Sequence, residues 1–105
     1  MSYEELQERL SEFGLDNSEA KLYASLLKTG PLKVADLARV SGFNRVQAYR
    51  ILQRLESRGI VETTLEKPMK FVAAKPAVAF DILAKTLKEK IKLIEDEKDH
   101  FDDLP

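Results

Sequence analysis

The chain has 105 residues, 33 % of them charged, and a formal net charge of −1 at pH 7. This length fits one small domain with a modest core. The absence of cysteine excludes disulfides, thiolate zinc sites and cysteine nucleophiles. No apolar run has the length of a membrane span, and the first residues lack the pattern of a signal peptide, so the sequence predicts a cytoplasmic protein.

Two helices are predicted in the first thirty residues. The first is indicated by apolar residues at helical spacing: Leu6, Leu10 and Phe13. The second opens at Asp16, because its carboxylate can accept from the N–H of Glu19 while the Glu19 side chain reaches back, which forms a capping box. It is expected to end at the Gly-Pro step and to bury four apolar residues: Ala20, Tyr23, Leu26 and Leu27.

A helix-turn-helix is predicted in the middle of the chain. Residues 34–40 form a helix of about two turns, and residues 41–43 form a tight turn. Asn44 then begins the helix 44–57 through a capping box with Gln47. Gly59 ends it, because a residue without a Cβ takes the left-handed conformation at low cost. One stripe of this helix must face a core: Ala48, Ile51, Leu52 and Leu55.

The opposite face of helix 44–57 is a polar ridge that contains one apolar side chain, Val46. Arg and Gln present the donors and acceptors that match guanine and adenine edges, and Val46 fits a thymine methyl. The alternative for a lone helix is an ordinary solvated face, but the neighbouring elements argue against it. We therefore expect five residues to read bases in the major groove: Arg45, Val46, Gln47, Arg50 and Gln53.

A β-hairpin is predicted directly after this helix. Residues 60–65 and 70–73 are rich in β-branched or aromatic residues, and residues 66–69 separate them as a turn. A hairpin in this place is a wing. Lys67 and Lys70 put positive charge at its tip and flank, where phosphates could be met.

The charges are unevenly distributed along the chain. The first 27 residues hold two basic and six acidic residues, residues 28–75 hold ten basic and four acidic ones, and residues 76–105 hold five lysines and eight acids. The basic segment contains the helix-turn-helix and the wing, as DNA binding requires. The acidic ends favour a site-selective regulator over a chromatin-coating protein. The single histidine, His100, lies in an acidic tail that is expected to be solvated.

A long helix is predicted from Pro76 to about residue 99, since proline suits a first turn. It would be roughly 36 Å long, too long to bury along so small a domain. Its apolar seam is therefore expected to pair with a second copy. The alternative is an intramolecular helix that packs through Ile82 and Leu83. The seam residues expected to dimerise the protein are Phe80, Ala84, Leu87, Ile91 and Ile94.

Residues 6–95 resemble the N-terminal winged-helix domain of the TrmB-like archaeal transcriptional regulators. Four segments carry most of the likeness: Glu19–Tyr23, Asn44–Tyr49, Arg58–Glu62 and Lys67-Pro68. The resemblance implies a dimeric transcription regulator with helix 44–57 in the major groove. The resemblance also implies that the Tyr49 hydroxyl donates to a DNA phosphate. The alternative is that Tyr49 packs under the wing. The expected contacts to the DNA backbone are Asn44, Tyr49, Arg54, Lys67 and Lys70.

Typical members of that family continue into a large sugar-binding effector domain, for which 105 residues leave no room. We therefore expect no small-molecule effector domain. The predicted organisation is a DNA-binding domain at residues 1–75 and a dimerisation helix with an acidic tail at residues 76–105.

The sequence as a whole predicts a mostly α fold with a small β-hairpin, a winged helix-turn-helix that carries a long C-terminal dimerisation helix. No catalytic constellation is evident, so neither an enzyme nor a cofactor is expected. The predicted function is sequence-specific binding of double-stranded DNA by a homodimeric transcription regulator. Two alternatives remain: a winged-helix module for protein–protein interaction, and a general DNA-architectural protein.

Overall fold

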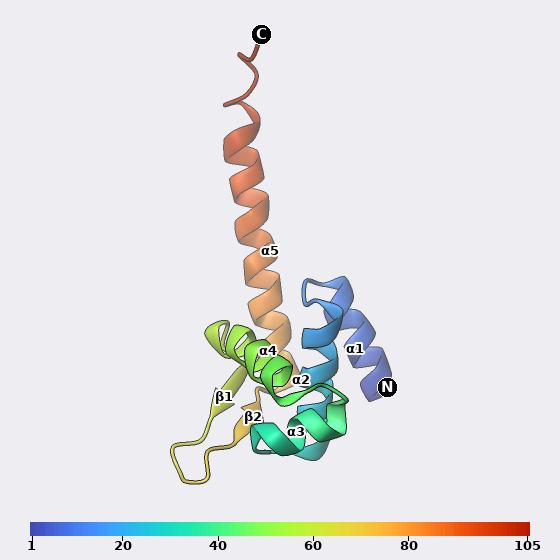
Figure 1. Cartoon of the computed structure of the whole chain (residues 1–105). Helices are drawn as coiled ribbons and strands as arrows, with labels where there is room; N and C mark the ends of the chain where they lie inside the picture. The colour runs from blue at the N-terminus through green and yellow to red at the C-terminus, as the bar shows by residue number, and fades with distance from the viewer.

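Five helices and one two-stranded sheet make up the computed structural model, which describes residues 1–105. In chain order the elements are α1 (Tyr3–Glu12), α2 (Asn17–Thr29), α3 (Val34–Ser41), α4 (Arg45–Ser57), β1 (Val61–Thr63), β2 (Phe71–Ala73) and α5 (Pro76–Lys98). The first four helices and the hairpin gather at one end of the molecule, and α5 projects from them (Figure 1). The predicted fold class is confirmed.

The helix starts follow local side-chain chemistry. Both predicted capping boxes are present, with Asp16 and Glu19 opening α2 and Asn44 and Gln47 opening α4. The start of α1 was not predicted. There the Ser2 hydroxyl accepts a hydrogen bond from the backbone N–H three residues later, at 3.1 Å. In each case a side-chain oxygen satisfies a backbone donor that the first turn leaves without a partner.

Two glycines set the ends of the helix-turn-helix helices. Gly42 follows α3 with φ of 80°, and Gly59 follows α4 with φ of 79°. Both values lie in the left-handed region, where a side chain would add strain. The Gly59 turn also closes α4, because the N–H of Ile60 donates to the carbonyl of Leu55 at 3.0 Å. The chain then enters β1 at Val61.

One apolar core lies between α1 to α5 and the hairpin. The predicted α4 stripe is buried in it, as are three of the four predicted residues of α2, while Leu27 is partly buried. Tyr23 is fully buried, and its hydroxyl donates to the carbonyl of Ala74. Burial of the ring raises the pKa of Tyr23 to about 12. This bond ties α2 to the segment that joins β2 to α5.

The hairpin is shorter than predicted. β1 and β2 are antiparallel, with Glu62 opposite Val72, and neither includes Leu65, which is fully exposed. A third segment joins the ladder through Leu32, whose N–H donates to the carbonyl of Phe71 at 3.2 Å while the Phe71 N–H donates back at 2.8 Å. No local pattern indicates this pairing, because Leu32 stands alone between a Gly-Pro turn and α3.

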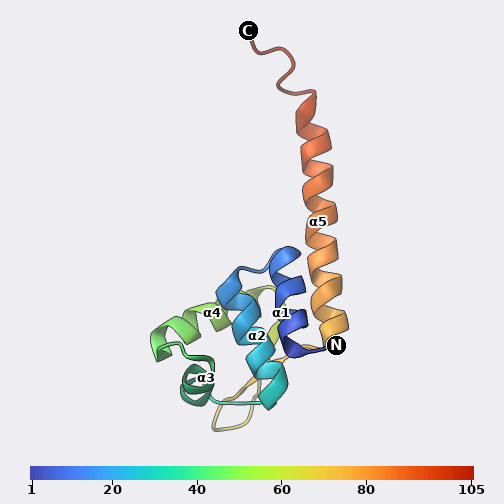
Figure 2. The ribbon, with the colours of Figure 1, turned by 90° about the vertical axis from the view of Figure 1, so that its right-hand side faces the viewer.

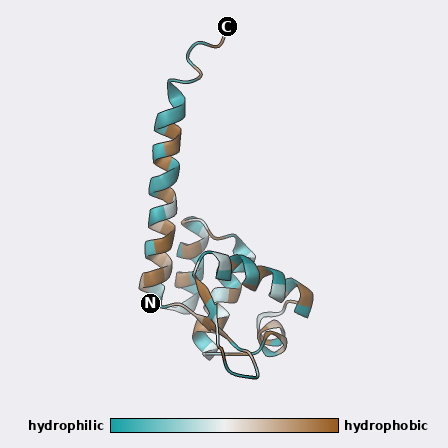
Figure 3. Cartoon of the chain, turned by 90° about the vertical axis from the view of Figure 1, so that its left-hand side faces the viewer, coloured by the Kyte–Doolittle hydropathy of each residue, from teal (hydrophilic) through white to brown (hydrophobic).

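The helix α5 has two different halves. Ala79 and Leu83 are buried in the common core, so the core continues past the domain boundary predicted at residue 76. From Leu87 to Lys98 every residue is exposed. Figure 2 shows this second half extending beyond the domain, and Figure 3 shows apolar segments recurring along it. The molecule measures 57 × 30 × 23 Å as a result.

Candidate nucleic-acid interface

The outer face of α4 carries the predicted base-reading residues. Arg45, Arg50 and Gln53 are exposed, and Val46 has 61 % of its surface open to solvent. Because Ala48, Ile51, Leu52 and Leu55 fill the opposite stripe, the helix cannot rotate to hide this ridge without exposing its apolar side. Val46, Arg50 and Gln53 therefore lie together on one free surface, whereas Arg45 is exposed on the flank of the first turn.

Two predicted contact residues already have a structural task. The side chain of Asn44 accepts from the N–H of Gln47 at 2.8 Å, and the side chain of Gln47 accepts from the N–H of Asn44 at 3.1 Å. Both side chains are exposed, so their NH₂ groups remain free to donate. The cap fixes where these donors lie at the start of α4.

Arg54 turns toward α2 rather than standing free. Its guanidinium lies 3.6 Å from the Asp16 carboxylate and 3.7 Å from that of Glu19, so the prediction that it serves DNA phosphates is weakened. Glu19 is nearly buried, whereas half of the Arg54 side chain is exposed. Burial raises the pKa of Asp16, but the Glu19 N–H, the Ser18 hydroxyl and Arg54 together outweigh it, and the net pKa is lowered.

Tyr49 is 44 % exposed. It lies on the flank of α4 away from Arg54, since five residues along a helix bring a side chain to a different face. The residue is thus partly open to solvent. It can therefore donate to an external acceptor.

The hairpin tip presents positive charge on a braced loop. Lys67 and Lys70 are exposed, and Thr64 holds the base of the loop, since its N–H donates to the Lys70 carbonyl at 2.9 Å while its hydroxyl accepts from the Lys70 N–H at 3.0 Å. Two apolar side chains are exposed beside them: Leu65 and Met69. α3 and the hairpin lie together at the end of the molecule opposite the tip of α5 (Figures 1 and 2).

Sequence reasoning missed Lys21. The charge distribution puts it in the acidic N-terminal segment, but its ammonium lies 5.4 Å from the centre of the Phe43 ring, beside the turn between α3 and α4. The contact joins residues far apart in the chain, so no local pattern announces it. Lys21 is exposed and adds positive charge next to the start of α4.

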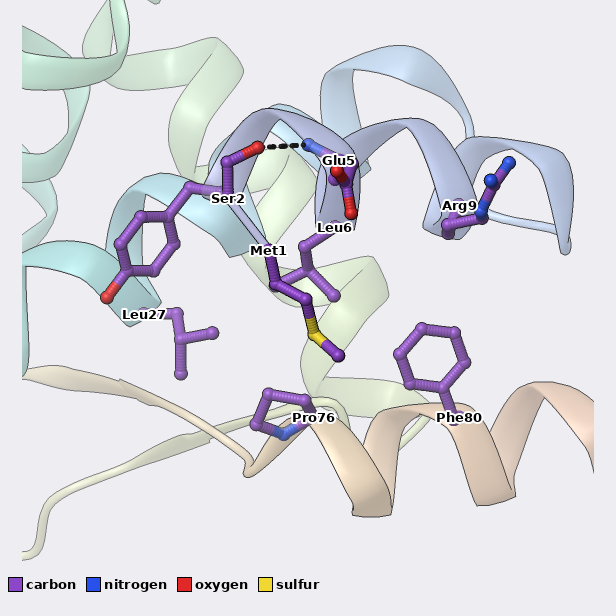
Figure 4. A pocket seen from close by; sticks show the side chains of 9 residues that line it. Met1, Ser2, Glu5, Leu6, Arg9, Leu27, Pro76 and Phe80 are labelled. Atoms are coloured by element: carbon purple, nitrogen blue, oxygen red, sulfur yellow. Dashed lines mark hydrogen bonds between the residues drawn. The ribbon is translucent and has the colours of Figure 1, made fainter.

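An apolar hollow lies away from this surface. It measures about 570 Å³ and lies between α1, the end of α2 and the start of α5, with Leu6, Leu27, Pro76 and Phe80 among its lining residues. Figure 4 shows Met1 reaching into it between Leu6 and Pro76. No group of His, Cys, Asp or Glu side chains is arranged to hold a metal ion. None of the helices combines the length and the apolar character that crossing a membrane requires.

Comparisons with known proteins agree on one family. The family model described as sugar-specific transcriptional regulator TrmB matches residues 10–77. The HTH-type sugar sensing transcriptional regulator TrmBL1 of Pyrococcus furiosus is 32 % identical over 104 residues, which are 99 % of this chain and 30 % of that protein. The putative HTH-type transcriptional regulator TrmBL2 of the same organism is 32 % identical over 93 residues, 88 % of this chain and 35 % of that protein.

One solved structure supports the same likeness, and a second supports the fold. The structure of TrmBL2, described as an archaeal chromatin protein with a novel mode of DNA binding, superposes with a TM-score of 0.80 at 31 % identity, covering 95 % of this chain and 39 % of that one. The transcriptional regulator Tm0710 of Thermotoga maritima has a TM-score of 0.60 at 15 % identity, covering 90 % and 71 %, and supports the fold alone. The chain spans about a third of the length of the curated relatives it matches.

Proposed function

Because the chain belongs to the TrmB family of sugar-specific transcriptional regulators, we propose that it binds specific sites on double-stranded DNA as a homodimer. In this proposal α4 lies in the major groove and the hairpin lies on the phosphate backbone. The observation that carries the proposal is the free ridge on α4, which directly follows the Gly42 turn and has a core stripe on its other side.

Base reading falls to the side chains of α4 that have no partner inside the protein. Arg50 and Gln53 are exposed near the middle of the ridge, Val46 lies at its start, and Arg45 is exposed on the flank of the same first turn. Arg suits guanine, Gln suits adenine and Val46 suits a thymine methyl. Gln47 contributes only the donors of its NH₂ group, because its oxygen belongs to the cap.

Backbone contacts fall to the free cations and donors around this ridge. Lys67 and Lys70 of the hairpin are exposed, and so is Tyr49, whose hydroxyl is a potential donor. Lys21 adds a charge beside the turn. Arg54 is assigned instead to holding α4 against the start of α2, since two carboxylates already surround it.

Dimerisation is assigned to the exposed half of α5. Leu87, Ile91 and Ile94 are 42 %, 55 % and 66 % exposed, and they recur along one side of the helix. Ala84 belongs to the same stripe. Phe80 is half-buried inside the protomer, with its ring centre 6.2 Å from that of Phe13, so it lies at the inner edge of the interface.

A second candidate is sequence-independent coating of DNA. It is favoured by the likeness to TrmBL2, whose structure is described as that of an archaeal chromatin protein. Both candidates use the same positive surface, but only the first requires base contacts from α4.

The test is a titration of labelled random duplex DNA with the protein at several salt concentrations. The affinity should fall steeply with salt, because binding releases counterions from the phosphates. Lys67→Ala/Lys70→Ala should lower the affinity and reduce the salt slope by about one unit for each phosphate that is no longer neutralised. Lys85→Ala/Lys92→Ala, with the same charge change on α5, should alter neither. No binding by the unmodified protein, or equal reductions in both variants, would contradict the proposal.

A further inference from the structure

The charges of α5 and its tail are separated along the helix axis. Four lysines occupy the stretch 85–92 against one acid, Glu89, whereas six acids occupy the stretch 95–103 against one lysine, Lys98. All of these side chains are exposed. The exposed half of α5 is therefore basic near the domain and acidic at its far end.

The part of α5 that needs a partner is also well defined. Exposure is continuous from Leu87 to Lys98, and Leu87, Ile91 and Ile94 form its apolar seam. At 1.5 Å per residue this overhang is about 18 Å long. A partner helix of the same length would cover it without meeting the domain.

We propose that the occupant is a second copy of this overhang running in the opposite direction, with Ile91 opposite the partner's Ile94 and Leu87 opposite the partner's Lys98. This inference rests on the dimer proposed above and gives it an orientation and a register. The Lys98 stem can lie along Leu87 while its ammonium reaches water.

Charge complementarity favours this orientation. On one flank of the seam Lys88 meets the partner's Glu95, and on the other flank Lys90 meets the partner's Glu97. The two-fold symmetry forms each pair twice. A parallel pair would keep one favourable contact, between Lys90 and the partner's Glu95, but it would otherwise lay the lysine-rich stretches side by side and the acidic stretches side by side, so it forms fewer favourable pairs.

The register also gives the tail a place to bind. A notch of about 230 Å³ lies where α5 leaves the domain, with Phe13 and Leu83 in its lining and Arg58 and Lys90 bringing positive charge to it. The residues after the partner's Lys98 reach this point of α5. They carry an exposed aromatic ring, Phe101, among acids, which matches both the apolar and the basic parts of the notch.

The same register sets the distance between the two DNA-binding domains. Along the α5 axis it separates the two copies of Leu83 by about 28 Å and the two copies of Ala79 by about 40 Å. These residues are buried in the core of each domain.

Disulfide trapping tests the orientation, because the chain contains no cysteine of its own. Leu87→Cys and Lys98→Cys are oxidised separately and as an equimolar mixture, after light scattering has established the oligomeric state of each. The antiparallel register puts Leu87 next to the partner's Lys98 but about 16 Å along the axis from the partner's Leu87. Since a disulfide needs Cα atoms within about 7 Å, a covalent dimer is expected only in the mixture.

Each other result overturns the proposal. Efficient covalent dimers from each variant alone would show a parallel pair. If light scattering shows dimers but oxidation gives no covalent dimer in any of the three samples, the register or the interface is a different one. A monomeric unmodified protein would remove both this inference and the dimer of the proposed function, whereas salt-dependent DNA binding in the titration would still support the DNA-binding part.

Discussion

Each side chain on the outer face of α4 is distinguished by what it already does inside the protein. Asn44 and Gln47 cap the helix, Arg54 pairs with acids of α2, and Arg50 and Gln53 have no internal partner. Free side chains can exchange water for base edges without breaking an existing bond. We therefore assign specificity mainly to Arg50 and Gln53.

Replacing Arg50 or Gln53 with alanine is expected to weaken binding to a specific site by about 1 to 3 kcal/mol. Binding to a scrambled duplex should change little, because base contacts contribute little there. Fluorescence anisotropy with both duplexes measures the two affinities, and Ser57→Ala on the same ridge is the control. Equal reductions on both duplexes would mean that Arg50 acts on the backbone and not on the bases.

The capping carboxylate Asp16 should make stability depend on pH in the acid range. Its folded pKa lies below the ordinary value of 3.8. The stabilisation is therefore fully present above pH 3.8 and is lost as the pH falls through the folded value. Asp16→Asn keeps an oxygen acceptor at the cap but does not titrate.

The measurement is the melting temperature of both proteins from about pH 6 to about pH 2. The unmodified protein should melt higher than Asp16→Asn at the upper end, and the difference should shrink toward the lower end. A difference that stays constant across this range would show that the ionised form of Asp16 contributes nothing to folding.

The sequence allowed the capping boxes to be predicted but not the position of Arg54. A capping box joins residues three apart, so its chemistry is visible locally. The pairing of Arg54 with Asp16 and the contact of Lys21 with Phe43 depend on how α4 packs against α2. Helical periodicity places Arg54 outside the buried stripe of α4, so nothing in the sequence alone indicates that it pairs with carboxylates of another helix.

At the scale of elements, the core stripes and turn glycines predicted all five helices, whereas the sheet was predicted only in part. The pairing of Leu32 with Phe71 joins segments distant in the chain. The predicted strands were too long because β-branched Thr64 and apolar Leu65 extend the pattern beyond the paired residues.

The junction between β2 and α5 depends on the hydroxyl of Tyr23. Tyr23→Phe removes the donor to the Ala74 carbonyl and should destabilise the protein by about 1 kcal/mol. Urea unfolding followed by circular dichroism measures this change, with Tyr3→Phe on the half-exposed Tyr3 ring as the control. No difference between the two variants would mean that the bond does not support the junction.

The exposed seam of α5 should control the oligomeric state. Leu87→Glu/Ile91→Glu places charge on the seam and is expected to give folded monomers by light scattering at micromolar concentrations. Lys92→Glu changes the net charge by the same amount on the opposite side of the helix and should remain dimeric. A monomeric unmodified protein, or dimers that survive both substitutions, would exclude this seam as the interface.

At the scale of the whole molecule, the elongated shape separates two surfaces. α3 and the hairpin lie at one end, and the free half of α5 extends toward the other (Figure 1). The charge pattern predicted this division, because the basic residues gather between 28 and 75. Binding two half-sites through one dimer should raise the affinity well above that of a single domain.

The central claim is that a two-fold dimer reads DNA through α4, and selection of binding sites from a random duplex pool tests it most directly. Such a dimer should select an inverted repeat whose half-site centres lie about 10 to 10.5 base pairs, or a multiple of that, apart. Arg50→Ala should relax the selected sequence at one position in each half-site, and Lys67→Ala should leave the selected sequence unchanged while weakening binding. A pool that yields no preferred sequence, or one that Arg50→Ala selects unchanged, would contradict the claim and favour sequence-independent coating of DNA.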